Sequence, residues 1–267
     1  MIQKIDIHIH PRQDDADMSG YLRIMDRHNV DAALIHGLED SSWDPAVSGG
    51  TPNDAVIRAV RSHPGRFHGT LCVDFTDGVE RVVGKIREFH DKGAMGIKLF
   101  PNFGFDPNDD RYEPIWVELE KRKMLVFSHC GWLAPDRKAP SRRISSLDGA
   151  SPFHFEVPAR RHPTVDFVFA HFGGAATYLE TLVLRSRLDN TYADTCPGWG
   201  RWVWENDLPG LKAMPKAKLL YGTDNAGEAY GQDDIWWSEK LLSMGWSYAD
   251  IHSYFYGNAA RLLRIGG

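Results

Sequence analysis

The sequence predicts an α/β fold: a parallel, eight-stranded (β/α)8 barrel of the TIM type with an extra helix at its C-terminus. Short apolar stretches alternate with helix-like stretches along the whole chain, which is typical of a parallel sheet. Eight such units follow one another without a break in composition, and 267 residues suit one barrel of this kind. No glycine-rich G-x-G-x-x-G turn follows the first strand, which disfavours the alternative, an open doubly wound sheet.

The expected elements alternate between strand and helix. Strands are expected where apolar runs rich in β-branched and aromatic residues occur, at 4–10, 31–36, 67–73, 94–100, 124–128, 165–170, 191–194 and 218–221. Helices are expected at 20–28, 55–62, 79–89, 115–123, 153–161, 178–188, 203–214, 235–244 and 248–263. Glycine and proline mark several ends, such as Gly93 after the third of these helices. Together the elements predict a single domain over residues 1–267.

Composition and charge limit the partners and the cellular location that we expect for this protein. The net charge of -5 gives no attraction to nucleic acid or anionic membranes, and no apolar run is long enough to cross a bilayer. The first strand begins almost at once, so no signal peptide is expected. The three cysteines show no C-x-x-C spacing, which favours a reduced cytoplasm. We therefore expect a cytoplasmic protein whose partner is a small-molecule substrate.

The first strand carries the most informative pattern. Polar and apolar residues alternate in D-I-H-I-H, so Asp6, His8 and His10 are expected on one face and the three isoleucines on the other. We expect the histidines to point into the barrel, where two imidazoles separated by one residue can bind one metal ion. The isoleucines are expected to point outward against helices.

Further polar residues follow the other strands. Lys98, His129, His171 and Asp224 end the fourth, fifth, sixth and eighth strands. In a closed barrel these ends converge on one pocket, where active sites of this fold lie. Imidazole and carboxylate ligands suit Zn²⁺ best, while Fe²⁺, Mn²⁺ or Co²⁺ are alternatives. Three histidines and an aspartate would leave a position for a water with a lowered pKa, and Asp224 can accept its proton.

This set of motifs resembles the amidohydrolase superfamily, and in particular its amidohydrolase 2 branch. The motifs are D-I-H-I-H at 6–10, G-I-K-L-F-P at 96–101, F-S-H-C-G at 127–131, F-A-H-F-G-G at 169–174, Y-G-T-D-N at 221–225 and G-N-A-A-R-L at 257–262. The branch includes lactone hydrolases and decarboxylases related to aminocarboxymuconate-semialdehyde decarboxylase. The resemblance covers the whole chain, and the ordered combination is more specific than any single motif.

The resemblance implies roles for individual residues. His8, His10, His129 and Asp224 would bind one divalent metal ion, with Asp224 also the general base. His171 would contact the catalytic water or the substrate. In a two-metal site, His129 and His171 would instead bind the second ion, and a carboxylated Lys98 would bridge the pair. One ion is favoured, because the sites of this branch generally look mononuclear and commonly include a lysine in G-x-K-L. In a one-ion site, Lys98 would pair with an acidic neighbour or contact the substrate.

The resulting hypothesis is a metal-dependent hydrolase. A metal-activated water would cleave an ester, lactone or amide bond of a small, carboxylate-bearing substrate. The alternative is non-oxidative decarboxylation of an aromatic or unsaturated carboxylic acid in the same pocket. A non-catalytic binding protein and a metal-free enzyme of the branch are the other hypotheses. The resemblance also suggests a homodimer.

Several other polar residues and the three cysteines have less specific expected roles. Asp6 would support the ligand histidines from one layer deeper or make a structural bond, and His36 would be a pocket wall or a core residue. Cys72, Cys130 and Cys196 are interpreted as small apolar filler. The basic stretch 137–143 is interpreted as surface, or as a loop that pairs with a carboxylate substrate.

Overall fold

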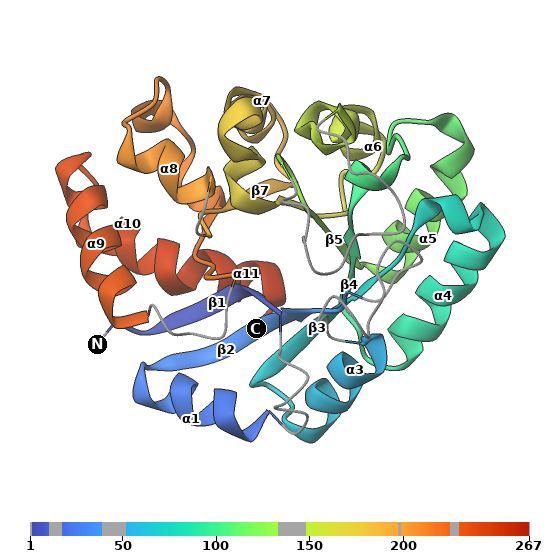
Figure 1. Cartoon of the computed structure of the whole chain (residues 1–267), viewed down its shortest axis with the longest axis horizontal. Coiled ribbons are helices and arrows are strands. Elements are labelled where there is room, and N and C mark those ends of the chain that lie inside the picture. Colours follow the sequence, from blue (N-terminus) through green and yellow to red (C-terminus); the bar gives the residue numbers. More distant parts are fainter. Residues whose placement is uncertain are drawn as a thin grey trace, which may run out of the picture.

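Eight parallel strands form a nearly closed barrel in a computed structural model of the chain, and helices surround it (Figure 1). The structure describes residues 2–10, 18–38, 52–132, 148–196, 199–224 and 230–266. The strands are hydrogen-bonded in sequence order from β1 to β8. This confirms the barrel that the alternation of strands and helices predicts.

The strands are short and their ranges agree with expectation to within a few residues. They are β1 Lys4–Ile9, β2 Val30–His36, β3 Phe67–Cys72, β4 Gly96–Leu99, β5 Leu125–Ser128, β6 Phe167–Phe169, β7 Thr191–Asp194 and β8 Leu219–Leu220. The helices are α1 Ser19–Arg27, α3 Asn53–Ser62, α4 Val79–Asp91, α5 Glu113–Arg122, α6 Glu156–Arg161, α7 Gly174–Arg187, α8 Trp199–Glu205, α9 Tyr230–Ser243, α10 Tyr248–His252 and α11 Asn258–Leu263.

The main differences from expectation lie in the helices. Of the stretch 203–214, which is expected to be partly helical, only the first three residues belong to α8, Trp199–Glu205, and Leu211–Ala213 forms a short 3-10 helix. α9 begins at Tyr230, five residues before the expected start at 235. The expected helix at 248–263 is divided into α10 and α11 by a π-helical turn, Ser253–Gly257. Pro158 lies in the first turn of α6, where the missing N–H of a proline costs no hydrogen bond.

The first strand contains a β-bulge, and the expected alternation along it is therefore wrong. Asp6 pairs with Ala33 of β2 and Ile9 pairs with Ile35, so β1 has one residue more than β2 between these pairs. An extra residue reverses which side chains face inward. Ile5 and Ile7 contact apolar residues of β5 and β6 across the barrel, so they point inward, whereas Ile9 joins the outer core with the helices.

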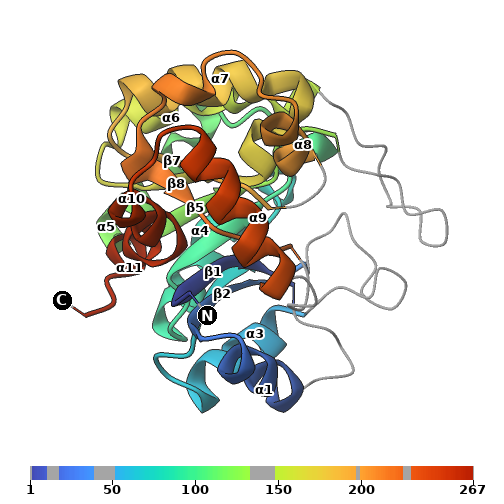
Figure 2. The same cartoon turned by 90° about the vertical axis from the view of Figure 1, so that its left-hand side faces the viewer.

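Asp6 is on the outer side of the barrel for the same reason. Its carboxylate accepts a hydrogen bond from Tyr230 of α9, at 2.8 Å. Lys4, two residues earlier, forms an ion pair with Asp234 of the same helix at 2.9 Å, and Figure 2 shows α9 running beside β1. Asp6 therefore does not lie below His8 on one face, as the alternation predicts.

The two ends of the barrel differ in what covers them. At the N-terminal ends of the strands, the inward side chains Ile5 and Leu125 form one apolar cluster with Ala259, Leu262 and Leu263 of α11. The extra C-terminal helix thus packs against the bottom of the barrel. β8 and β1 are joined near the other end, where Asp224 N donates to His8 O at 2.7 Å and Ile7 N donates to Tyr221 O at 3.1 Å.

No helix in the described ranges is long and apolar enough to span a membrane.

Candidate active site

The structure brings His8, His10 and Asp224 together at the C-terminal end of the barrel. The Nε2 atoms of His8 and His10 are 3.2 Å apart, and each lies 3.3 Å from Asp224 Oδ1. The bulge in β1 lets both imidazoles face inward, and the backbone bond from Asp224 N to His8 O fixes the aspartate beside them. Three potential ligand atoms therefore form a nearly equilateral triangle.

Burial disfavours the charged form of both imidazoles of this triangle. Burial, reinforced by the Lys98 ammonium, holds the pKa of His8 well below its ordinary value. Burial lowers the pKa of His10 to about 4, although the Asp224 carboxylate acts in the opposite direction. A neutral imidazole offers the lone pair that a metal ion requires.

The dimensions of the triangle fit a divalent ion. Zinc binds nitrogen and oxygen ligands at about 2.0–2.2 Å, so tetrahedral ligand atoms lie roughly 3.3–3.5 Å apart. The three observed separations, 3.2, 3.3 and 3.3 Å, come close to that spacing. The donor set of two imidazoles and one carboxylate also suits zinc or another first-row divalent metal.

His129 lies near the triangle but is not one of its corners. Its ring stacks on Phe100 and meets the His171 ring edge-on, with centroids 4.9 Å apart. Its Nε2 is buried and has no hydrogen-bond partner within the described ranges. Burial also lowers the pKa of this imidazole well below the ordinary value, which favours the uncharged form. An orphaned lone pair here fits a ligand, although its place in the metal shell stays a prediction.

His171 stands on a strained piece of backbone between β6 and α7. Both His171 and Phe172 have left-handed conformations, with φ of 56° and 53°. A non-glycine residue in this conformation costs of order 1–3 kcal/mol and persists mainly where the surrounding structure holds it in place. The side chain points its Nε2 toward Asp224 Oδ2, at 3.9 Å. His171 therefore faces the same side of the site as Asp224.

Lys98 is fully buried inside the barrel next to the triangle. Its Nζ lies 3.3 Å from His8 Nε2 and 4.4 Å from the centre of the Phe127 ring. Burial lowers the pKa of the ammonium, and the Asp224 and Asp194 carboxylates oppose that effect. Lys98 thus lies at the site, as predicted, but forms no ion pair with a carboxylate in the described part of the chain.

Asp194, the last residue of β7, is a site residue that sequence reasoning missed. Its Oδ2 is 2.7 Å from His8 Nδ1, and its Oδ1 accepts from the backbone N–H of His171 at 2.7 Å. The side chain is completely buried, and burial raises the pKa of its carboxyl. Asp194 therefore orients His8 through the nitrogen that faces away from the triangle. In the sequence, its position at the end of an expected strand is the signal that could have identified Asp194 as a site residue.

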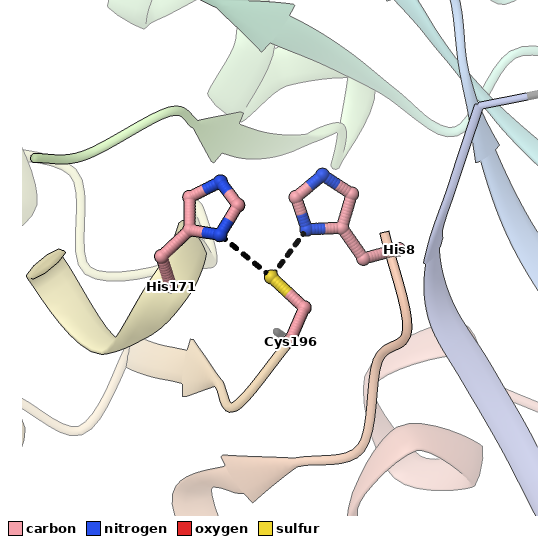
Figure 3. A group of neighbouring side chains, drawn as sticks. All are labelled: His8, His171 and Cys196. Carbon is pink, nitrogen blue, oxygen red and sulfur yellow. Dashed lines mark hydrogen bonds between the residues drawn. The ribbon is translucent and has the colours of Figure 1, made fainter. Parts of the chain in front are cut away.

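Cys196 is not inert filler, so that interpretation is wrong. Figure 3 shows its sulfur between two imidazoles, with Sγ 3.2 Å from His8 Nδ1 and 2.9 Å from His171 Nδ1. The three residues also form a potential metal-binding group. However, sulfur and nitrogen ligands of one zinc ion lie about 3.6 Å apart, and burial raises the pKa of this thiol well above its ordinary value. Hydrogen bonding explains these short contacts better than a second ion.

Asp6 supports the site from outside the barrel. Its Oδ1 accepts from the backbone N–H groups of His8 and Thr223, at 3.0 and 3.1 Å. Its Oδ2 accepts from the Thr223 hydroxyl at 2.6 Å and from Tyr230. Burial raises the pKa of this carboxyl to about 7 despite those bonds. Because Thr223 directly precedes Asp224, Asp6 links the two strand ends that carry the triangle.

The other candidates have simpler roles. His36 is a buried wall residue, with Nδ1 bonded to Thr70 at 2.6 Å and Nε2 to Ile7 O at 2.9 Å. Cys130 is buried and donates to Ser128 O at 3.6 Å. Cys72 is buried in an apolar cluster with Phe100 and Phe103. The basic stretch 137–143 lies outside the described residues.

Comparisons with known proteins agree with the resemblance that the motifs indicate. The model of the Amidohydro_2 family, described as amidohydrolase, matches residues 5–265. No curated protein sequence matches the chain significantly.

Solved structures of similar fold cover the entire chain at low identity. A TIM-barrel protein from Bordetella bronchiseptica is 15% identical with a TM-score of 0.70, covering 98% of this chain and 99% of that chain. 2,6-Dihydroxybenzoate decarboxylase from Rhizobium is 15% identical with a TM-score of 0.68, covering 100% of both chains. A probable 2-pyrone-4,6-dicarboxylic acid hydrolase from Acinetobacter baumannii is 16% identical with a TM-score of 0.62, covering 99% of this chain and 100% of that chain. These likenesses support the fold.

Proposed function

The chain belongs to the amidohydrolase family, and from that premise we propose that it is a metal-dependent hydrolase of small esters, lactones or amides. One observation carries the proposal. Asp224 Oδ1 lies 3.3 Å from the Nε2 atoms of both His8 and His10, and its other oxygen faces His171. A carboxylate in this position can belong to a metal shell and still accept a proton.

The metal would be held by His8, His10 and Asp224, with His129 as a further ligand. One divalent ion, zinc by preference, would supply Lewis acidity and lower the pKa of water from 15.7 to about 7. Neutral imidazoles and the unpartnered His129 Nε2 support this assignment. One ion is proposed, because His8 Nε2, His10 Nε2 and Asp224 Oδ1 converge on one point.

The protein's own groups would perform the proton transfers. Asp224 would take the proton of the attacking water, because it is the carboxylate at the centre of the site and is 29% exposed. His171 would donate a hydrogen bond to the carbonyl oxygen of the substrate, where negative charge develops during attack. Asp224 would then return its proton to the leaving group.

A carboxylate on the substrate is the expected recognition feature. Lys98 is a buried lysine beside His8 that forms no ion pair within the described ranges, and a substrate carboxylate would supply one. The names of the similar structures support this class, because dihydroxybenzoate and pyrone dicarboxylate both carry carboxylates.

Decarboxylation in the same pocket is the alternative. It is favoured by the full-length likeness to 2,6-dihydroxybenzoate decarboxylase. Both reactions would need the same ligands and a substrate carboxylate near Lys98, so only the products separate them.

A substrate screen in ¹⁸O-labelled water tests the proposal. Protein would be stripped with a chelator, reloaded with Zn²⁺ or Mn²⁺, and offered lactones, esters, amides and aromatic acids. We expect activity only after reloading, with one ¹⁸O atom in the acid product. Release of CO₂ without ¹⁸O in the organic product would establish the decarboxylase instead. Activity that survives complete chelation would overturn the metal-dependent mechanism.

A further inference from the structure

The sulfur of Cys196 lies where it can control the protonation pattern of His171. Cys196 follows β7, is completely buried, and contacts the Nδ1 atoms of His8 and His171 (Figure 3). A neutral imidazole has one N–H and one lone pair, and the hydrogen bond at one nitrogen decides what the other presents. The question is therefore which nitrogen of each histidine holds the proton.

The contact with Asp194 determines which ring nitrogen of His8 holds the proton. Asp194 Oδ1 accepts hydrogen bonds from the backbone N–H groups of His171, at 2.7 Å, and Cys196, at 3.2 Å. His8 Nδ1 is 2.7 Å from the other oxygen, Oδ2, and an acceptor-rich carboxylate requires a donor there. His8 therefore holds its proton on Nδ1, and its Nε2 lone pair faces His10 and Asp224.

His171 Nδ1 is then the acceptor left for the thiol proton. His8 Nδ1 is already a donor, whereas His171 Nδ1 is 2.9 Å from the sulfur. A thiol is weak both as a donor and as an acceptor, so geometry decides: the thiol proton needs an acceptor, and His171 Nδ1 is the nearer of the two ring nitrogens.

We propose that Cys196 is a positioning residue that holds His171 in the tautomer with the proton on Nε2. This inference rests on the proposed function and deepens it. With Nε2 protonated, His171 donates to the substrate carbonyl and has no lone pair there for a second metal ion. The thiol thus favours a one-ion site and a hydrogen-bond donor for the carbonyl oxygen.

The tautomer can be measured directly by ¹⁵N NMR of histidine-labelled, metal-free, full-length protein, with His171→Gln to assign the signal. Two-bond couplings distinguish the two tautomers without substrate or activity. We expect the Nε2–H form in the wild type and in Cys196→Ser, which keeps a donor. Cys196→Ala should shift His171 toward the Nδ1–H form, while Cys130→Ala, a matched loss of a buried thiol, should not.

Kinetics add a second readout. Cys196→Ala should lower kcat by about 10- to 100-fold with little change in KM, and Cys196→Ser should restore most of it. An Nδ1–H form of His171 in the wild type would overturn the proposal whatever the Cys196 variants show. An unchanged tautomer in Cys196→Ala would also overturn it. The NMR result is independent of the reaction, so failure of the hydrolase proposal would be recognised separately, by the ¹⁸O screen.

Discussion

His8 and Asp194 form a buried pair, with His8 Nδ1 2.7 Å from Asp194 Oδ2 and both side chains almost completely shielded from solvent. A carboxylate behind a metal-binding histidine fixes its ring and makes it a stronger ligand. In the proposed metal site, Asp194 would therefore fix the orientation of the His8 ring.

Asp194→Asn tests this preparation. The amide keeps the size of the side chain but removes the negative charge opposite His8 Nδ1. We expect metal affinity to fall about 10- to 100-fold, measured by competition with a chromogenic chelator. Asp166→Asn, at the opposite end of the barrel, is the matched control and should bind metal like the wild type. Equal affinity of Asp194→Asn and the control would remove Asp194 from the site.

Asp224→Asn separates metal binding from proton transfer. Asparagine tolerates the left-handed backbone at this position, where φ is 51°, and its amide oxygen can still contact a metal. It cannot accept a proton, so we expect activity to fall about 10²- to 10⁴-fold with most of the metal retained. Asp207→Asn has a similar backbone, with φ of 47°, on the protein surface and should remain active. Full activity of Asp224→Asn would exclude Asp224 as the general base.

Gly222 provides a test of how closely the strand ends must approach. A Cβ at this position would lie 2.9 Å from His8 Cβ, which is closer than side chains tolerate. Gly222→Ala should therefore displace His8 and weaken metal binding, with a loss of stability of about 1–3 kcal/mol. Gly84→Ala on α4 meets no atom within 4 Å and should be neutral or stabilising. Wild-type metal affinity in Gly222→Ala would contradict the close packing at His8.

The barrel and most residues of the candidate site could be predicted from the sequence, because both depend on patterns of neighbouring residues. Alternating apolar runs identify strands and helices, and Lys98, His129, His171 and Asp224 stand where parallel strands end. The register of β1 could not be predicted, because the bulge depends on how β1 pairs with β2. Asp6 therefore lies on the face opposite to the one that the alternation predicts.

Asp194 and Cys196, which contact the histidines of the site from behind, were harder to predict for a related reason. Asp194 is the last residue of an expected strand, but its link to His8 spans 186 positions of the chain and appears only when the barrel closes. Cys196 gives no sequence signal beyond its buried residue type. Its two imidazole neighbours come from β1 and from the turn after β6. Such hydrogen bonds are properties of the assembled barrel.

Glu118 of α5 predicts a pH dependence of stability. Hydrogen bonds from Arg87 of α4 and from Arg122 lower the pKa of Glu118 from 4.5 to about 2. Since the folded pKa is depressed, the ionised group stabilises the fold above about pH 4.5, and that contribution disappears as the pH falls toward 2. Glu118→Gln should lower the Tm at pH 7 by roughly 2–4 °C, or ~1 kcal/mol, because Arg87 is partly screened by solvent.

Thermal unfolding of both proteins from pH 7 to pH 3 checks this expectation. The difference in Tm between wild type and Glu118→Gln should shrink steadily below pH 4.5. Glu156→Gln, which removes an exposed pair with Arg160 on α6, should change the Tm little at any pH. A constant difference for Glu118→Gln down to pH 3 would show that the ion pairs do not cause it.

Metal content is the most direct test of the central claim that His8, His10 and Asp224 hold one divalent ion. Protein expressed in medium supplemented with Zn²⁺ or Mn²⁺ would be purified without chelators and measured by inductively coupled plasma mass spectrometry. We predict about one equivalent per chain in the wild type and in the surface control His252→Ala, and less than about 0.1 in the His8→Ala/His10→Ala double variant. A wild type with less than about 0.1 equivalent, one with two equivalents, or a double variant that keeps its metal would contradict the claim.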